Sequence, residues 1–391
     1  MRFLPLLAAL LLPVAAAAQN GGLAQHVQAA LALDAGFRTL EAQRSAAGAR
    51  GITARSSIAG SPSLSGSIRS DTRGPREVRE MELDIAAPMW LPGQRGAMLG
   101  TVESAVAEFD QRLVLRRLEI AGLLREGWWE AAEARRAAQL ARERLNTARE
   151  IARDVTRRAQ LGDIPPTEAL LARNETLGAE LGLAQAEAMA VQAAAAYRVL
   201  TGGLEPNLPV EAVRGRGAHP ALRAAEAMLA NAEARQRLVA ATPRDNPELG
   251  FFGRQEGGVG TTESTSLGLR LRFPLATEAR NAPRRAGAES EITRATAQLN
   301  QARRTVEAQI LRAQAALRTS EAALRIARQR LAVGNEQEGI ALRAFRSGET
   351  GTFDLYRVRQ LRLEAANDEG RASVEASRAR SRVNQAMGVV P

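Results

Sequence analysis

The residues able to carry acid–base chemistry or to bind a metal ion are few and widely spaced in this chain. It contains no cysteine and only two histidines, His26 and His219. The absence of cysteine excludes disulfides, thiolate metal sites and a cysteine nucleophile. Two histidines so far apart in sequence do not make a histidine-rich metal site. We find no glycine-rich phosphate loop, no serine–histidine–aspartate order and no cluster of metal ligands, so we expect neither an enzyme nor a cofactor.

Two carboxylates, Glu82 and Asp84, are close enough in sequence to be considered as a catalytic pair. They lie in the segment 80–86, Glu-Met-Glu-Leu-Asp-Ile-Ala, where charged and apolar residues alternate. Such alternation is typical of a β-strand with one polar and one apolar face. Residues two apart on a strand point to the same side. We therefore interpret Glu82 and Asp84 as parts of one polar wall.

A second segment, 266–273, alternates in the same way, and four strands are expected in all, over residues 63–69, 79–87, 248–255 and 264–273. Strands of this kind can form part of a barrel wall that is apolar toward lipid and polar toward a lumen. We then expect Met81, Leu83, Leu269 and Leu271 to face lipid, and Glu82, Asp84, Arg270 and Arg272 to face the lumen. Four strands cannot close a transmembrane barrel, which needs about eight, whereas three chains would supply twelve.

The strands belong to a sequence pattern that occurs twice, at a constant offset along the chain. Pro88 falls on Pro274, Gly162 on Gly348 and Gly202 on Gly388. With only two copies and so long a period, the pattern indicates a duplicated structural unit rather than a solenoid.

A helix is expected from Leu23 to about Ile58, before the first strands, and long helices are expected to follow each pair of strands. The segment from about 95 to 160 contains no proline. At about 1.5 Å per residue, such a helix is a rod on the order of 90 Å long. Heptad spacing of apolar residues indicates antiparallel coiled-coil hairpins. The heptad positions are Ile292, Leu299, Val306 and Ala313; Ile310, Leu317, Leu324 and Leu331; and Leu170, Leu177, Ala184 and Val191.

The N-terminal sequence indicates export. Residues 1–18 combine Arg2, an apolar stretch and a small-residue cleavage site, as in a secretory signal peptide. The remaining parts are a first repeat (19–204, hairpin about 95–200), a Gly- and Pro-rich linker (205–217) and a second repeat (218–391, hairpin about 284–387).

The chain is basic but does not resemble a nucleic-acid-binding protein. Its net charge is +10, and all 53 basic residues are arginine, spread along helices among 43 acids. Aromatic residues make up only 3% of the chain, so base-stacking platforms are not expected. We interpret the arginines as solvated helix faces and expect no nucleic-acid partner.

Several motifs, taken in order, resemble the TolC-type outer-membrane efflux family. They are the segments after the two turn glycines, Glu168-Ala-Leu-Leu-Ala-Arg and Asp354-Leu-Tyr-Arg-Val-Arg; the strand ends at Pro88 and Pro274; and the helix start at His219-Pro220. The resemblance covers essentially the whole mature chain, duplication included. It implies a mainly α-helical protein with a small β part, whose homotrimer joins a 12-stranded barrel in outer-membrane lipid to a periplasmic helical tunnel.

The same resemblance implies partners and sites. Such channels are passive exit ducts that dock on a periplasmic adaptor (membrane fusion) protein and an inner-membrane transporter such as an RND-type pump. The candidate docking tips are Gly162, Asp163, Gly348 and Glu349. Asp354 matches the first acid of the family's gate motif, but the second acid is Arg357 here, and an i, i+3 ion pair between the two would partly neutralise the gate. The alternative interpretation is that Asp354 only caps the start of its helix.

Two other classes of protein explain the sequence less well. An exported coiled-coil structural or adhesive protein would explain the rods but not four alternating strands at duplicated positions. A periplasmic enzyme would need catalytic residues that the sequence does not offer.

Overall fold

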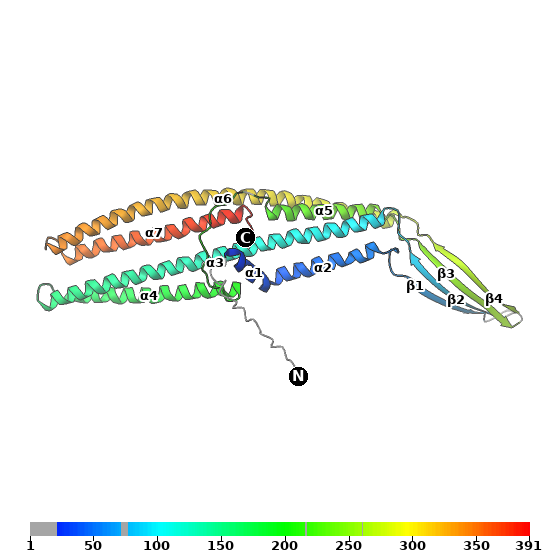
Figure 1. The fold of residues 1–391 in the computed structure, drawn as a ribbon, viewed down its shortest axis with the longest axis horizontal. Coiled ribbons are helices and arrows are strands. Elements are labelled where there is room, and N and C mark those ends of the chain that lie inside the picture. The colour runs from blue at the N-terminus through cyan, green and yellow to red at the C-terminus, as the bar shows by residue number, and fades with distance from the viewer. Residues whose placement is uncertain (1–21, 72–76, 216, 260) are drawn as a thin grey trace, which may run out of the picture.

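The computed structural model describes residues 22–71, 77–215, 217–259 and 261–391. It is a long rod of helices that ends in a four-stranded sheet (Figure 1). In chain order the elements are α1 (Leu23–Leu33), α2 (Ala35–Arg55), β1 (Ser63–Ser70), β2 (Glu77–Pro88), α3 (Gln94–Gln160), α4 (Pro166–Thr201), α5 (Pro220–Ala240), β3 (Glu248–Val259), β4 (Thr261–Arg272), α6 (Glu278–Arg346) and α7 (Thr352–Ala386). The signal peptide predicted over 1–18 lies outside the described residues.

The two halves of the chain use the same elements in the same order. The series α2, β1, β2, α3, α4 is followed by α5, β3, β4, α6, α7. Equivalent glycines share their conformation: φ is 84° at Gly162 and 79° at Gly348, and 71° at Gly202 and 75° at Gly388. A positive φ favours glycine because it has no Cβ. The constant offset of the sequence pattern therefore has a structural counterpart at each helix end.

The helices lie side by side in a fixed order. It is α4, α3, α7, α6 near the helix turns and α2, α3, α5, α6 near the sheet. Helix α3 has 67 residues and α6 has 69. At about 1.5 Å per residue, each long helix extends on the order of 100 Å. Shorter helices complete the layer, α4 and α2 beside α3, α7 and α5 beside α6. No helix in the described part of the chain is both long and apolar enough to cross a membrane.

The sheet is antiparallel throughout, with strand order β1-β2-β3-β4. Glu82 lies opposite Ser67 on β1 and Arg254 on β3, and Asp84 lies opposite Ser65 and Phe252. Within the described residues, β1 and β4 each pair on one side only. Both outer edges of the sheet therefore present unpaired backbone donors and acceptors.

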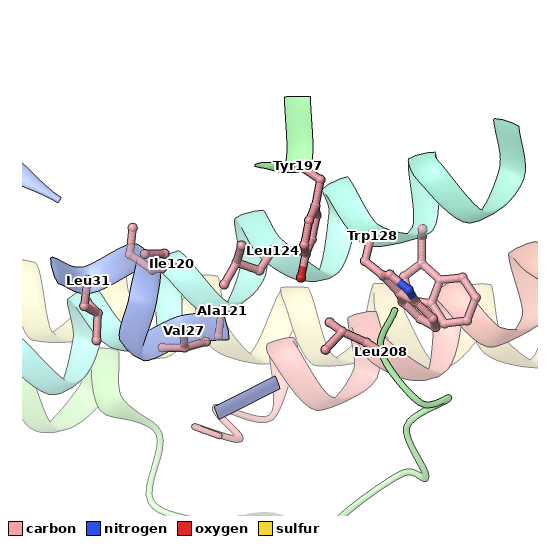
Figure 2. Packing of buried hydrophobic residues seen from close by; sticks show 10 residues of the cluster. Val27, Leu31, Ile120, Ala121, Leu124, Trp128, Tyr197 and Leu208 are labelled. Atoms are coloured by element: carbon pink, nitrogen blue, oxygen red, sulfur yellow. The ribbon is translucent and has the colours of Figure 1, made fainter. Parts of the chain in front are cut away.

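The main hydrophobic core lies midway along the rod, where α1, α3, α4 and the linker meet (Figure 2). Its buried members are Val27, Ala30, Leu31, Ile120, Ala121, Leu124, Trp128, Trp129, Tyr197 and Leu208. His26 Nδ1 lies 2.8 Å from the Tyr197 hydroxyl, which joins α1 to α4. Trp129 Nε1 donates to Ser381 Oγ at 2.9 Å and joins the same core to α7.

A buried arginine fixes the linker against both halves. Arg125 of α3 forms two hydrogen bonds of 2.9 Å to the carboxylate of Glu211 in the linker. It also donates to Gln385 Oε1 at 2.6 Å and to the Val389 carbonyl at 3.3 Å. Nearby, the backbone N–H of Arg214 donates to Asn384 Oδ1 at 2.9 Å. The linker is therefore an ordered strap that ties α3 to the C-terminal end of α7.

Two helix predictions need correction. The helix expected from Leu23 to about 58 is two helices, because Asp34 adopts an extended conformation and its Oδ1 accepts the Phe37 N–H at 2.6 Å, which caps α2. The helix expected from about 284 begins at Glu278 and runs through Pro283. Pro283 lies close to the start of α6, where a proline removes only one backbone hydrogen bond, and the helix therefore continues.

The heptads behave differently on the two hairpins. The eight α6 residues expected in a coiled-coil seam are buried or half-buried, as predicted. On α4 the prediction was wrong, because Leu177 and Val191 are 56% and 64% exposed and Leu170 is exposed beside them. Helix α4 packs on α3 through another face, which includes Ala172 and Ala179. An apolar heptad stripe is therefore left on the outer edge of the chain.

Candidate functional site

The two helix turns form one end of the molecule, at the opposite end from the sheet (Figure 1). At the first turn, Gly162 N–H donates to Ala159 O at 3.2 Å and Asp163 N–H to Arg158 O at 3.0 Å. At the second turn, the equivalent bonds of Gly348 and Glu349 measure 3.2 and 2.9 Å. Both are Schellman motifs, which satisfy the last carbonyls of a helix and require a left-handed residue. The four candidate tip residues thus occupy equivalent places.

The space beside each turn glycine is open. A Cβ added at Gly162 or Gly348 would meet no atom within 4 Å. Asp163 and Glu349 are exposed next to them. The tips therefore offer a small, accessible surface with an acidic side chain on each hairpin.

The candidate gate pair lies just beyond the second turn. Asp354 is in the first turn of α7, where a carboxylate interacts favourably with the helix N-terminus. Both Asp354 and Arg357 are exposed, and no ion pair joins them in the described structure. The expected neutralisation through an i, i+3 pair is therefore not formed.

The hairpins are joined near the tips by contacts that the sequence alone did not predict. Tyr356 of α7 packs against Ile151 and Val155 of α3, and burial raises the pKa of Tyr356 to about 12. Arg158 of α3 lies over the Phe345 ring of α6, 4.3 Å from its centroid. A cation over an aromatic face is attracted to it. Separating the two hairpins at this end requires both contacts to break.

The sheet has one apolar and one polar face, as the alternation predicted. The apolar face carries large side chains that nothing in the described chain covers: Leu64, Ile68, Met81, Leu83, Ile85, Phe251, Leu267, Leu269 and Leu271. Glu82, Asp84, Arg270 and Arg272 share the opposite face, because strand residues in register point to the same side.

Three of these four polar residues come together in a charged cluster, which we define as Glu80, Glu82, Asp84, Arg254, Glu256 and Arg270. Arg254 lies 2.8 Å from Glu80, 2.9 Å from Glu82 and 3.6 Å from Glu256. Arg270 pairs with Glu82 and lies 3.4 Å from Asp84. Arg272 lies outside this cluster, at the C-terminal end of β4, where its Nη1 is 3.6 Å from Glu248 Oε2.

Arg254 was not among the predicted lumen residues, because polar and apolar residues alternate less clearly along its strand, where Phe251 and Phe252 are adjacent. Its strand was expected, and the alternation along 248–255 would have placed it on a face with Phe252. No group of three or more histidine, aspartate or glutamate side chains suited to a metal ion occurs among the described residues.

Known proteins similar to this chain include one sequence relative and several solved structures. No protein-family model matches the chain. Protein CyaE of Bordetella pertussis is 30% identical over 322 residues, which cover 74% of this chain and 67% of CyaE. The outer membrane protein VceC of Vibrio cholerae superimposes with a TM-score of 0.73 at 15% identity, over 94% of this chain and 96% of VceC. The CmeC outer membrane channel of Campylobacter jejuni gives 0.71 at 17% identity, over 94% and 85%.

Proposed function

Because the chain belongs to the TolC-type family of outer-membrane channels, the exit channels of tripartite efflux and secretion systems, we propose that three copies close into a ring around one continuous pore. The sheet lies in the outer membrane and the helical body in the periplasm. Channels of this family transport cargo without catalysing a reaction.

The observation that carries this proposal is that both edges of the protomer are unpartnered and complementary. In an alternating four-stranded sheet, β1 and β4 run in opposite directions. When all copies point the same way, β1 of one copy meets β4 of the next as an antiparallel pair. Such head-to-tail contacts close a ring if the rotation allows it. Three copies give twelve strands, above the minimum of about eight, and leave no free edge.

The helical layer has the same two edges. On α4 an exposed, uncharged stripe, the α4 stripe, follows heptad spacing; it consists of Leu170, Asn174, Leu177, Leu181, Ala184, Ala188 and Val191. On α6 an exposed apolar stripe, the α6 stripe, consists of Ile326, Val333 and Ile340. Within one chain, α3 and α7 lie between these two helices.

The two stripes lie at matching heights above the tips. Leu170 is four residues from the start of α4 at Pro166, and Ile340 is six residues from the end of α6 at Arg346. Leu177 and Val333 are eleven and thirteen residues from the same ends. At about 1.5 Å per residue, each pair differs in height by about 3 Å. The α4 stripe of one copy therefore fits the α6 stripe of its neighbour.

A cross-link between these stripes tests the ring. We expect the double variant Leu177→Cys, Val333→Cys to form a covalent trimer under mild oxidation. The chain has no other cysteine, so background cross-linking is absent. The matched control is Leu177→Cys with Asn335→Cys, since Asn335 faces α7 and accepts from Arg362 at 3.1 Å. Monomers only in the first variant, or equal cross-linking in both, would contradict the ring.

We further propose that the tips bind the periplasmic adaptor, through which an inner-membrane transporter such as an RND-type pump is coupled. The open space beside Gly348 supports a contact surface there. Gly348→Trp should reduce transport and adaptor binding while leaving the trimer and its membrane insertion intact. Normal transport by this variant, or loss of its trimer, would count against the tip as the docking surface.

A further inference from the structure

The charged cluster on the sheet has a layered arrangement. The acids lie nearest the wall, where the side chains of Glu82 and Asp84 are 11% and 9% exposed. The arginines lie over them, where Arg254 and Arg270 are 36% and 44% exposed. Glu82 is shared between them: its Oε2 accepts from Arg254 and its Oε1 accepts from Arg270. Water on this side of the sheet therefore meets two guanidiniums whose common counter-charge is Glu82.

The cluster is held against the wall by an aromatic ring. Phe252 lies over Gly268 on the neighbouring strand, where an added Cβ would come within 2.5 Å of the ring. The guanidiniums of Arg254 and Arg270 lie 5.8 and 5.0 Å from the ring centroid. Planar guanidiniums stack readily on such faces. The two positive charges are thus fixed in place by Phe252 and Glu82 together.

The cluster carries a small net negative charge. Four carboxylates, those of Glu80, Glu82, Asp84 and Glu256, face two guanidiniums, which leaves 2 − 4 = −2 per chain. Removing the charge of Glu82 alone takes this sum to −1 and leaves both exposed arginines without their shared partner. Removing Arg254 takes it to −3. The balance is therefore sensitive to single residues, and in opposite directions.

We propose that Glu82 determines the ion selectivity of the pore at the level of the sheet, by neutralising two guanidiniums that would otherwise line the lumen. This inference rests on the proposed function, because it requires the polar face to surround water. Rings of charged side chains set selectivity in other channels. A unit charge about 10 Å away in water changes the local concentration of a monovalent ion about twofold, and a ring repeats the effect in every copy.

The test is the reversal potential of the purified full-length protein in planar bilayers across a KCl gradient. Glu82→Gln should lower the ratio of cation to anion permeability by about twofold or more, and Arg254→Gln should raise it. Glu82→Asp, which keeps the charge, should stay close to wild type. Each variant is first checked for assembly by its resistance to dissociation in detergent, and Arg254→Gln, for which a raised ratio is expected, keeps the test informative if Glu82→Gln fails to assemble.

Arg79→Gln is the matched control. Arg79 is an exposed residue of β2 on the apolar face of the sheet. The substitution Arg79→Gln removes the same charge as Arg254→Gln. It should leave the reversal potential unchanged. Equal shifts in Arg79→Gln and Arg254→Gln, or unchanged selectivity in Glu82→Gln pores that conduct normally, would overturn this inference and leave the proposed function standing. A wild-type protein that forms no pore would instead contradict the proposed function.

Discussion

Replacing Arg125 with methionine tests how the two halves of the chain are held together. The substitution keeps an apolar stem of similar size but leaves the Glu211 carboxylate, Gln385 and the Val389 carbonyl without their donor. Removing one partner of a buried ion pair costs about 3–5 kcal/mol. Glu211 retains 21% side-chain exposure, so the lower end of about 3 kcal/mol applies. That free energy corresponds to about a 10²-fold change in the equilibrium for opening the linker.

Limited proteolysis of the native protein measures this opening. Trypsin cleaves after arginine, and Arg214 lies in the linker with its N–H bonded to Asn384. When opening is fast relative to cleavage, the cleavage rate follows the population of the open form. Cleavage after Arg214 should therefore be about 10²-fold faster in Arg125→Met than in wild type.

Two variants make this measurement specific. Glu205→Gln removes an ion pair with Arg198 whose side chains are 65% and 40% exposed, and such pairs contribute at most about 1 kcal/mol. Arg125→Met combined with Glu211→Leu leaves no unpaired charge and should be cleaved more slowly than Arg125→Met alone. If Arg125→Met were cleaved no faster than Glu205→Gln, the assignment of Arg125 as the linker's anchor would be wrong.

Four further variants have expected outcomes. Gly348→Ala should lower the thermal midpoint slightly, because left-handed strain costs about 1–2 kcal/mol. Gly388→Ala should lower the midpoint more, because its Cβ would lie 2.7 Å from Pro220 Cδ. Burial lowers the pKa of His26, so the folded chain binds this proton less well than the unfolded chain. The free energy of unfolding is therefore highest above about pH 6.5, as far as His26 contributes, and it decreases as the pH falls below that value. In thermal scans, His26→Gln should make this decrease smaller. Asp354→Ala should raise the conductance of the trimer and weaken its cation preference, whereas unchanged bilayer currents would leave Asp354 as a helix-end residue.

Local patterns predicted the parts of the fold that depend on local geometry. The faces of the strands followed from alternation, because side chains on a strand alternate with a period of two. The reversals at Gly162 and Gly348 followed from glycine at the end of a long helical pattern, and both have positive φ.

Features that depend on distant partners could not be predicted in this way. The break between α1 and α2 at Asp34 is stabilised by Arg116, which is 82 residues away in the sequence. Arg116 Nε donates to Asp34 Oδ1 at 3.0 Å. The linker's anchor joins Arg125 to Gln385, 260 residues apart. The heptads of α4 were correctly found but assigned to the wrong partner, because spacing identifies an apolar stripe and not what covers it.

The central claim is that one face of the sheet meets water and the other meets lipid. Two adjacent residues of β4 test it most directly, Ser266 on the polar face and Leu267 on the apolar face. Both are exposed in the isolated chain, Leu267 by 87%, so only lipid can protect Leu267 from water. In vesicles containing the assembled protein, Ser266→Cys should react with a membrane-impermeant thiol reagent and Leu267→Cys should not, although both should react once the protein is denatured. Rapid labelling of Leu267→Cys with protection of Ser266→Cys would contradict the account.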